Sequence, residues 1–234
     1  SNHYGMAGWY AIRAMKEGLI GISMTNTTPL MAPTRSKEAA LGTNPIALGA
    51  SAKNGDKFLL DMATTAVSLG KVEIQIRKDE PIPDGWAQDS SGNVTNFKKH
   101  SKKVVMPLGG FEITSGYKGY GLGAMVEILC GVMAGSNYST HVRDLTEEDC
   151  EANLGQVFIA VDPNQFANGF EDRLTDMNDI LRSCKPTDPK NPVLVPGDKE
   201  KHNMEDVNKA GGIQYLPNQL QTCENLAKRL NIKP

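Results

Sequence analysis

Two features that would place a protein in a membrane or on nucleic acid are missing from this 234-residue sequence. No apolar run approaches the roughly 18 consecutive residues that a membrane-spanning helix needs, and the mean hydropathy is −0.37. Lys and Arg number 25 against 27 Asp and Glu, so the formal net charge is −2. A chain without basic excess does not neutralise a phosphate backbone well. We therefore expect neither a membrane nor a nucleic-acid partner.

Cysteine is also scarce, and its spacing excludes two classes of stabilised scaffold. The four cysteines lie far apart, with no CxxC pair and no histidine at metal-ligand spacing: Cys130, Cys150, Cys184 and Cys223. Neither a zinc site nor a disulfide framework is indicated. Reduced thiols and the absence of a secretory leader at the start of this sequence predict a cytoplasmic protein.

The standard nucleotide-binding and hydrolase motifs are missing as well. Neither GxGxxG after a first strand nor GxxxxGK[ST] occurs, which argues against a Rossmann fingerprint and a P-loop. There is no GxSxG nucleophile elbow and no paired-carboxylate signature, so hydrolase chemistry is not supported.

The elements that the sequence does contain predict an α/β or α+β fold. Hydrophobic residues make up 39% of the chain, enough for a globular core. Periodicity and turn signals predict helices over 6–17, 62–77, 122–133, 166–184, 199–210 and 218–230, and strands over 20–25, 46–49, 58–60, 156–161 and 213–216. Asp61 is expected to open the second helix, and the strongly apolar helix over 122–133 to be central. Without regular βαβ spacing, we expect a mixed sheet flanked by helices.

Four groups of residues have the chemistry of a functional site, although each also has a structural explanation. The Gly116–Gly121 segment with Lys118 precedes the apolar helix and suits either an anion site or close helix packing. His3 lies in a polar setting, where an imidazole can exchange a proton at neutral pH. Asp61 is either a helix cap or a ligand for hydroxyl groups. The lysines at 98, 99, 102 and 103 suit a solvated loop or a phosphate contact.

A series of motifs makes the interpretation more specific. Their order is SNHYG at residues 1–5, LGTNP at 41–45, LDMATT at 60–65, IPDGW at 82–86, PLGG at 107–110 and YKGYGL at 117–122. In this order and spacing they resemble the malate/L-lactate dehydrogenase family of the non-Rossmann type, which includes ureidoglycolate dehydrogenase, sulfolactate dehydrogenase and diketogulonate reductase.

The resemblance implies an activity and a set of site residues. The implied reaction is hydride transfer between NAD or NADP and a small 2-hydroxy acid such as malate or lactate, catalysed by a homodimer. His3 matches the family's acid/base histidine, and Thr27 its substrate hydroxyl. Asn44, with Thr43, is expected to line the cleft, unless its turn alone explains it. The matching cofactor-binding residues are Asp61, Met62, Ala63, Lys118, Gly119, Pro196, Gly197 and Asp198.

The resemblance also implies a longer family pattern. Residues 1–234 would form the NAD(P)-binding and catalytic region, about the C-terminal two thirds of a longer family member. The family carries, ahead of this region, a Ser-His-Gly segment and an arginine that contribute to the active site. A substrate carboxylate calls for a cation, for which Arg13 and Arg35 are the nearby candidates. The alternative interpretation is a catalytically inactive nucleotide-binding or assembly partner.

Overall fold

A computed structural model describes residues 1–89, 91–93, 104–145, 147 and 149–232. The predicted lysine cluster at 98–103 lies outside the described residues. The chain forms two compact units, Ser1–Gly197 and Asp198–Pro234. The assignment of the whole chain to one functional region stays a prediction.

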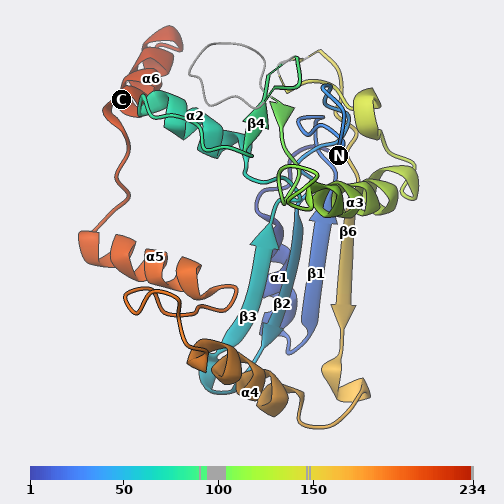
Figure 1. Cartoon of the computed structure of the whole chain (residues 1–234), viewed down its shortest axis with the longest axis vertical. Coiled ribbons are helices and arrows are strands. Elements are labelled where there is room, and N and C mark those ends of the chain that lie inside the picture. Colours follow the sequence, from blue (N-terminus) through green and yellow to red (C-terminus); the bar gives the residue numbers. More distant parts are fainter. Residues whose placement is uncertain (90, 94–103, 146, 148, 233–234) are drawn as a thin grey trace. The chain divides into compact units, whose positions relative to one another are not determined.

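A four-stranded sheet organises the first unit. Its strands are β1 (Ile20–Thr25), β2 (Ile46–Ser51), β3 (Lys57–Met62) and β6 (Gln156–Val161), in the order β3-β2-β1-β6 (Figure 1). The predicted sheet flanked by helices is confirmed, but every strand pair is antiparallel rather than mixed. A tight turn with left-handed Asn54 and Gly55 joins β2 to β3, and such a turn connects only antiparallel neighbours.

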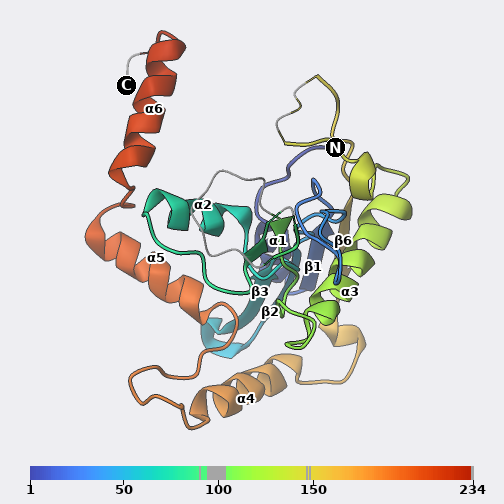
Figure 2. The same cartoon turned by 45° about the horizontal axis from the view of Figure 1, so that its top comes forward.

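The two faces of the sheet are covered by different helices. Helix α1 (Ala7–Lys16) packs its small residues Ala7 and Ala11 against Ala47 of β2. On the opposite face, helix α3 (Gly116–Glu127) and the π turn η2 (Ile128–Val132) cover one end of the sheet. Helix α4 (Phe170–Ser183) covers the other end, and Figures 1 and 2 both show α3 and α4 at opposite ends of the strands. Successive side chains of a strand point to opposite faces of the sheet, so each strand packs against α1 on one face and against α3 or α4 on the other.

A smaller cluster extends the first unit beyond the sheet. Helix α2 (Leu69–Arg77) packs Val72 against Ile82 and Val105. The short strands β4 (Ala87–Gln88) and β5 (Val104–Val105) pair beside it. This cluster leads the chain back to the turn that precedes α3.

Helix α4 is fixed to the β2–β3 turn by an ion pair. The Arg182 guanidinium donates from Nη1 and Nη2 to the two oxygens of Asp56, each at 2.9 Å, and Asn178 donates to the same carboxylate at 3.0 Å. The Arg182 guanidinium is the main cause of the lowered pKa of Asp56. A bidentate pair of this kind is stronger than an ordinary surface salt bridge.

Replacing Arg182 with methionine is expected to destabilise the protein by about 1–2 kcal/mol at neutral pH, because the charged hydrogen bonds to Asp56 are lost. Asp56 is ionised in both states above its unfolded pKa of about 3.9, so the full contribution is present there. Below that value it declines as the pH falls toward the lower folded pKa. Urea unfolding at pH 7 and pH 3 should therefore show a smaller difference from the parent at pH 3. An equal difference at both pH values would contradict the assignment.

Several sequence predictions are confirmed and others need correction. The helix over 6–17 and the strands over 20–25 and 156–161 are confirmed. Helix α2 begins at Leu69 rather than near residue 62, because the chain after β3 forms bonds with two loops instead. Residues 213–216 form no strand. The predicted buried strand β6 is an edge strand with Phe158 and Ile159 exposed, and α3 with η2 covers only one end of the sheet, leaving Ile128 exposed.

Residues 198–232, the described part of the second unit, contain two helices. Helix α5 (Asp198–Ala210) begins with acidic residues, and helix α6 (Pro217–Arg229) ends with basic ones, as the helix dipole favours. The Leu216 N–H donates to the Gln219 side chain at 2.9 Å, which caps α6. Among all described residues, no helix has the length and apolar character to cross a membrane.

Candidate active site

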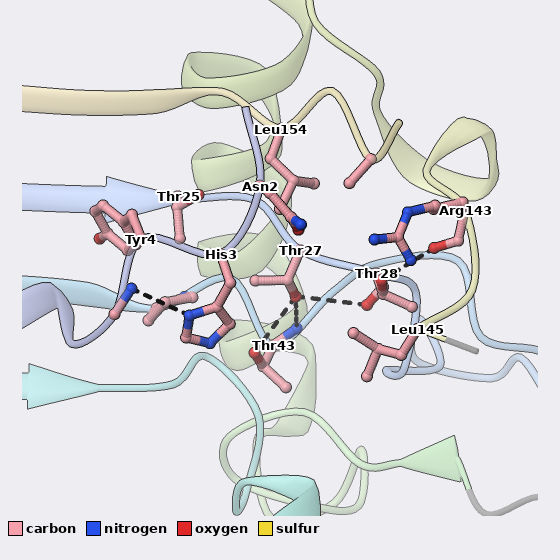
Figure 3. Close-up of a pocket in the computed structure, with 13 residues that line it drawn as sticks. Asn2, His3, Tyr4, Thr25, Thr27, Thr28, Thr43, Arg143, Leu145 and Leu154 are labelled. Carbon is pink, nitrogen blue, oxygen red and sulfur yellow. Dashed lines mark hydrogen bonds between the residues drawn. The ribbon is translucent and has the colours of Figure 1, made fainter. Parts of the chain in front are cut away.

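A small pocket lies where β1 ends and β2 and β6 begin. Its volume is about 110 Å³, which suits a molecule of a few heavy atoms rather than a dinucleotide. The pocket is lined by Asn2, His3, Tyr4, Gly5, Thr25, Thr27, Thr28, Thr43, Pro45, Arg143, Leu145, Ala152 and Leu154 (Figure 3). One imidazole, one guanidinium, one phenol and four threonine side chains therefore line one cavity with an apolar wall.

His3 reaches the pocket from the segment that leads into α1. Its Nδ1 accepts a hydrogen bond from the Gly5 N–H at 3.1 Å, and this contact sets the orientation of the ring. Nε2 is the ring nitrogen left for a ligand, and Figure 3 shows the ring beside Thr27 and Thr43. The Ser1 carbonyl accepts from the Leu154 N–H at 2.8 Å, so the segment that carries His3 is tied to the strand β6 side of the pocket.

Tyr4 fixes the same segment from its other side. Its hydroxyl bonds to Ser23 Oγ at 3.0 Å, and its ring stacks on Tyr10 with 4.7 Å between centroids. The Tyr10 hydroxyl donates to the Tyr4 carbonyl at 2.8 Å. Burial raises the pKa of Tyr4 to about 12, so this phenol stays neutral at physiological pH. Tyr4 therefore supplies a neutral hydroxyl and a rigid support next to His3.

Threonine hydroxyls form the floor of the pocket. Thr27 Oγ1 accepts from the Thr43 N–H at 2.9 Å and lies 3.4 Å from Thr43 Oγ1. Thr28 donates to the Arg143 carbonyl at 3.0 Å. These bonds join the loop after β1 to the segment before β2 and to the loop that carries Arg143. The floor is thus pre-formed from three parts of the chain.

Arg143 supplies the cation of the pocket. Its Nη1 donates to the Asp144 carbonyl at 2.9 Å, while its Nε is buried without a hydrogen-bond partner in the described part of the chain. In Figure 3, Arg143 and His3 lie on opposite sides of Thr27 and Thr43. A guanidinium with an unused donor fits a carboxylate, which it binds in a planar, often bidentate geometry.

Arg143 was not predicted, and the two predicted cations lie elsewhere. Arg13 lies over the Trp9 ring at 5.3 Å, and Arg35 forms a bidentate pair with Glu112. Arg143 follows a short polar segment that has no motif of its own, and 140 residues separate it from His3. No local signal in the sequence connects the two.

The predicted cofactor residues of the first unit meet near the end of β3. Asp61 and Met62 end this strand, and Ala63 follows it. The Leu59 N–H donates to the Pro196 carbonyl at 2.9 Å, which places Pro196 and Gly197 along the same strand. Asp198 begins the second unit.

Asp61 has a structural partner that differs from the predicted one. Its Oδ2 accepts from the Gly8 N–H at 2.8 Å, so the carboxylate caps the first turn of α1 rather than opening a helix of its own. Asp61 pairs with Ala47 on the face of the sheet that α1 covers, so its carboxylate meets that helix directly. Its role toward a cofactor stays a prediction.

The Lys118–Gly119 pair is joined to the same region by a short chain of contacts. The Leu108 N–H donates to the Thr64 carbonyl at 2.9 Å, and Leu108 packs against Gly119. The first turn of α3 contains no acidic residue and has no side-chain cap. The Lys118 ammonium lies over the Tyr117 ring at 5.9 Å and forms no ion pair with any described residue. A free ammonium at a helix start fits a phosphate, so these residues suit a dinucleotide.

Gly119 is expected to be sterically required at the start of α3. A Cβ at this position would lie 2.3 Å from the Leu108 carbonyl oxygen and 2.4 Å from its nitrogen, and backbone atoms cannot move aside cheaply. We expect Gly119→Ala to destabilise the protein by about 1–3 kcal/mol through overpacking. Gly121 on the same helix has open space around it, so Gly121→Ala should stabilise by up to about 1 kcal/mol. Thermal unfolding of both variants tests this, and a Gly119→Ala variant as stable as the parent would contradict it.

Asn44, the other predicted substrate residue, does not line the pocket. It is fully buried, and its amide accepts from the Thr27 N–H at 3.2 Å and donates to the Gly123 carbonyl at 2.9 Å. The structure therefore brings together His3, Thr27 and Thr43 at the pocket, with Asn44 beneath them.

Comparison with known proteins gives the chain a family. The family described as malate/L-lactate dehydrogenase matches residues 1–223. Malate dehydrogenase of Pyrococcus abyssi is 43% identical over 239 residues, covering 100% of this chain and 65% of that protein. Ureidoglycolate dehydrogenase (NAD(+)) of Escherichia coli is 32% identical over 200 residues, which is 83% of this chain and 55% of that protein.

A solved structure agrees with the sequence comparison. Malate dehydrogenase from Pyrococcus horikoshii superposes with a TM-score of 0.83 at 37% identity, covering 100% of this chain and 64% of that one. The chain therefore spans between 55% and 65% of these relatives' length. The match over residues 1–223 and the shared fold show that the chain belongs to the malate/L-lactate dehydrogenase family.

Proposed function

We propose that this chain carries the catalytic centre of an NAD- or NADP-dependent oxidoreductase that interconverts a small 2-hydroxy acid and its 2-oxo acid. One observation carries the proposal: His3 and Arg143 line the same small pocket, with threonine hydroxyls between them. A carboxylate next to a hydroxyl-bearing carbon presents the two groups that such a pair recognises. Malate and lactate are the substrates that the family suggests.

Each side chain has a defined task in this proposal. The Arg143 guanidinium, which lines the pocket, binds the substrate carboxylate. Thr27 and Thr43 hydroxyls orient the substrate from the pocket floor. His3 Nε2 gives a proton to the carbonyl oxygen during reduction and takes it from the hydroxyl during oxidation.

The cofactor-binding residues complete the proposal. Lys118 would hold a phosphate, Asp61 a ribose hydroxyl, and Met62, Ala63, Gly119, Pro196 and Gly197 would line the remaining surface. The cofactor role of Asp198 stays a prediction from the resemblance. A bound nicotinamide supplies the hydride acceptor or donor. The pocket itself is too small for the whole cofactor, which is consistent with a separate surface for the dinucleotide.

The assembly and location are part of the same proposal. We infer a homodimer, because Trp9, Met125, Ile128 and Phe158 expose large apolar side chains in the first unit. The four free cysteines suit the cytoplasm, where thiols stay reduced. Sedimentation equilibrium tests the dimer.

Cofactor binding is the first experimental test. We expect the purified protein to enhance the fluorescence of NADH or NADPH, and to oxidise the reduced cofactor in the presence of oxaloacetate or pyruvate. Binding without turnover would instead favour the inactive nucleotide-binding or assembly partner. If neither cofactor binds, the proposed oxidoreductase function is wrong.

A further inference from the structure

A buried carboxylate with no task in the proposed reaction lies beneath the pocket floor. Glu127 ends α3 directly before the π turn η2, and it is only 5% exposed. Its Oε1 accepts from Asn26 Nδ2 at 3.0 Å and from the Ser139 N–H at 2.9 Å, and its Oε2 accepts from Asn44 Nδ2 at 2.6 Å. Burying a carboxylate is costly, and these three donors offset the cost.

The two asparagines are placed between residues of the pocket. Asn26 is flanked by Thr25 and Thr27, and Asn44 by Thr43 and Pro45; all four neighbours line the cavity. Both asparagines are fully buried and bond to Glu127. Each segment therefore presents its neighbours to the substrate and its asparagine to the same carboxylate.

The remaining amide atoms extend the connection to other parts of the pocket. Asn44 Oδ1 accepts from the Thr27 N–H at 3.2 Å, which links the two floor segments directly. Asn26 Oδ1 accepts from the Gly155 N–H at 3.0 Å, next to the pocket residue Leu154. The Ser139 N–H bond holds the short segment that leads to Arg143. One carboxylate thus joins three of the chain segments that surround the substrate.

We propose that Glu127 is the positioning residue of this pocket: it sets the spacing of Thr27 and Thr43 beneath the substrate without touching the substrate itself. The inference rests on the proposed dehydrogenase function. A carboxylate is needed because it accepts on both oxygens. A glutamine would turn its NH₂ group toward one of the donors, either Asn44 or the Asn26 and Ser139 pair.

Two variants and a matched control test the assignment. Glu127→Gln removes one acceptor with little change of shape. Glu127→Asp keeps the charge, but its side chain is one methylene shorter and places the carboxylate farther from the three donors. Glu112→Gln makes the same chemical change at the Glu112–Arg35 pair, outside the pocket lining. We expect Glu127→Gln to raise the KM for pyruvate or oxaloacetate about tenfold or more with a smaller change in kcat. The reason is that the threonines bind the substrate equally well in its ground state and in the transition state, and this binding is weakened. Glu127→Asp should have an intermediate effect, and Glu112→Gln none.

Hydrogen exchange gives a second readout that needs no activity. In Glu127→Gln, amide exchange at Thr27 and Ser139 should be about tenfold faster, while exchange at the Leu59 amide, bonded to Pro196, should be unchanged. Accelerated exchange without turnover in the parent would reject the proposed function but support the positioning role. Parent-like exchange and KM in folded Glu127→Gln would overturn the role. If that variant does not fold, parent-like values in Glu127→Asp would overturn it equally.

Discussion

Replacing His3 with alanine is expected to lower kcat for reduction of a 2-oxo acid by about two to four orders of magnitude, because no other imidazole lines the pocket in the described part of the chain. Cofactor binding should be unchanged, since the predicted cofactor residues lie near the end of β3 and the start of α3. Stopped-flow single-turnover kinetics with NADH or NADPH and pyruvate or oxaloacetate would measure the loss.

The matched control for this variant is His202→Ala. His202 lies on α5 in the second unit and is exposed. Its removal should leave kcat at the parent value. A His3→Ala variant with parent kcat would show that another group moves the proton, and the assignment of His3 as the acid/base would then be wrong.

Arg143→Met is expected to raise the KM for the 2-oxo acid by about ten- to a hundredfold, because charged hydrogen bonds contribute about 1.5–3 kcal/mol each. The change should fall mainly on KM, since the carboxylate keeps its charge throughout the reaction. Initial-rate measurements over a range of substrate concentration separate the two parameters. Arg143→Lys should recover only part of the loss, because a lysine cannot form the planar fork.

The control for Arg143 is a second arginine in the same unit. Arg13 lies over the Trp9 ring on α1 and outside the pocket lining, so Arg13→Met should leave the KM unchanged. An unchanged KM in Arg143→Met would instead exclude this side chain as the carboxylate-binding group. The buried Nε of Arg143 would then need another explanation.

Local pattern was sufficient for most elements of the fold. The helix at α1, the strands β1 and β6 and the Asn54-Gly55 turn follow from periodicity and turn chemistry, which depend on neighbours in sequence. The predicted start of α2 near residue 62 is wrong because residues 64–66 form hydrogen bonds with distant loops. The Thr64 N–H bonds to Thr43, and the Ala66 N–H bonds to Met106. Tertiary hydrogen bonds there replace a helical turn.

Some residues of the candidate site follow from local sequence motifs, and others are found only in the tertiary structure. The sequence by itself determined the family motifs, and through them the predictions for His3, Thr27 and the cofactor segments, because each motif is a run of adjacent residues. Only the tertiary structure decided that Arg143 faces His3, that Asp61 caps α1 and that Glu127 holds Asn26 and Asn44. These arrangements bring together residues 50 or more positions apart, and periodicity along one chain carries no information on which distant segments the folding of the sheet will bring together.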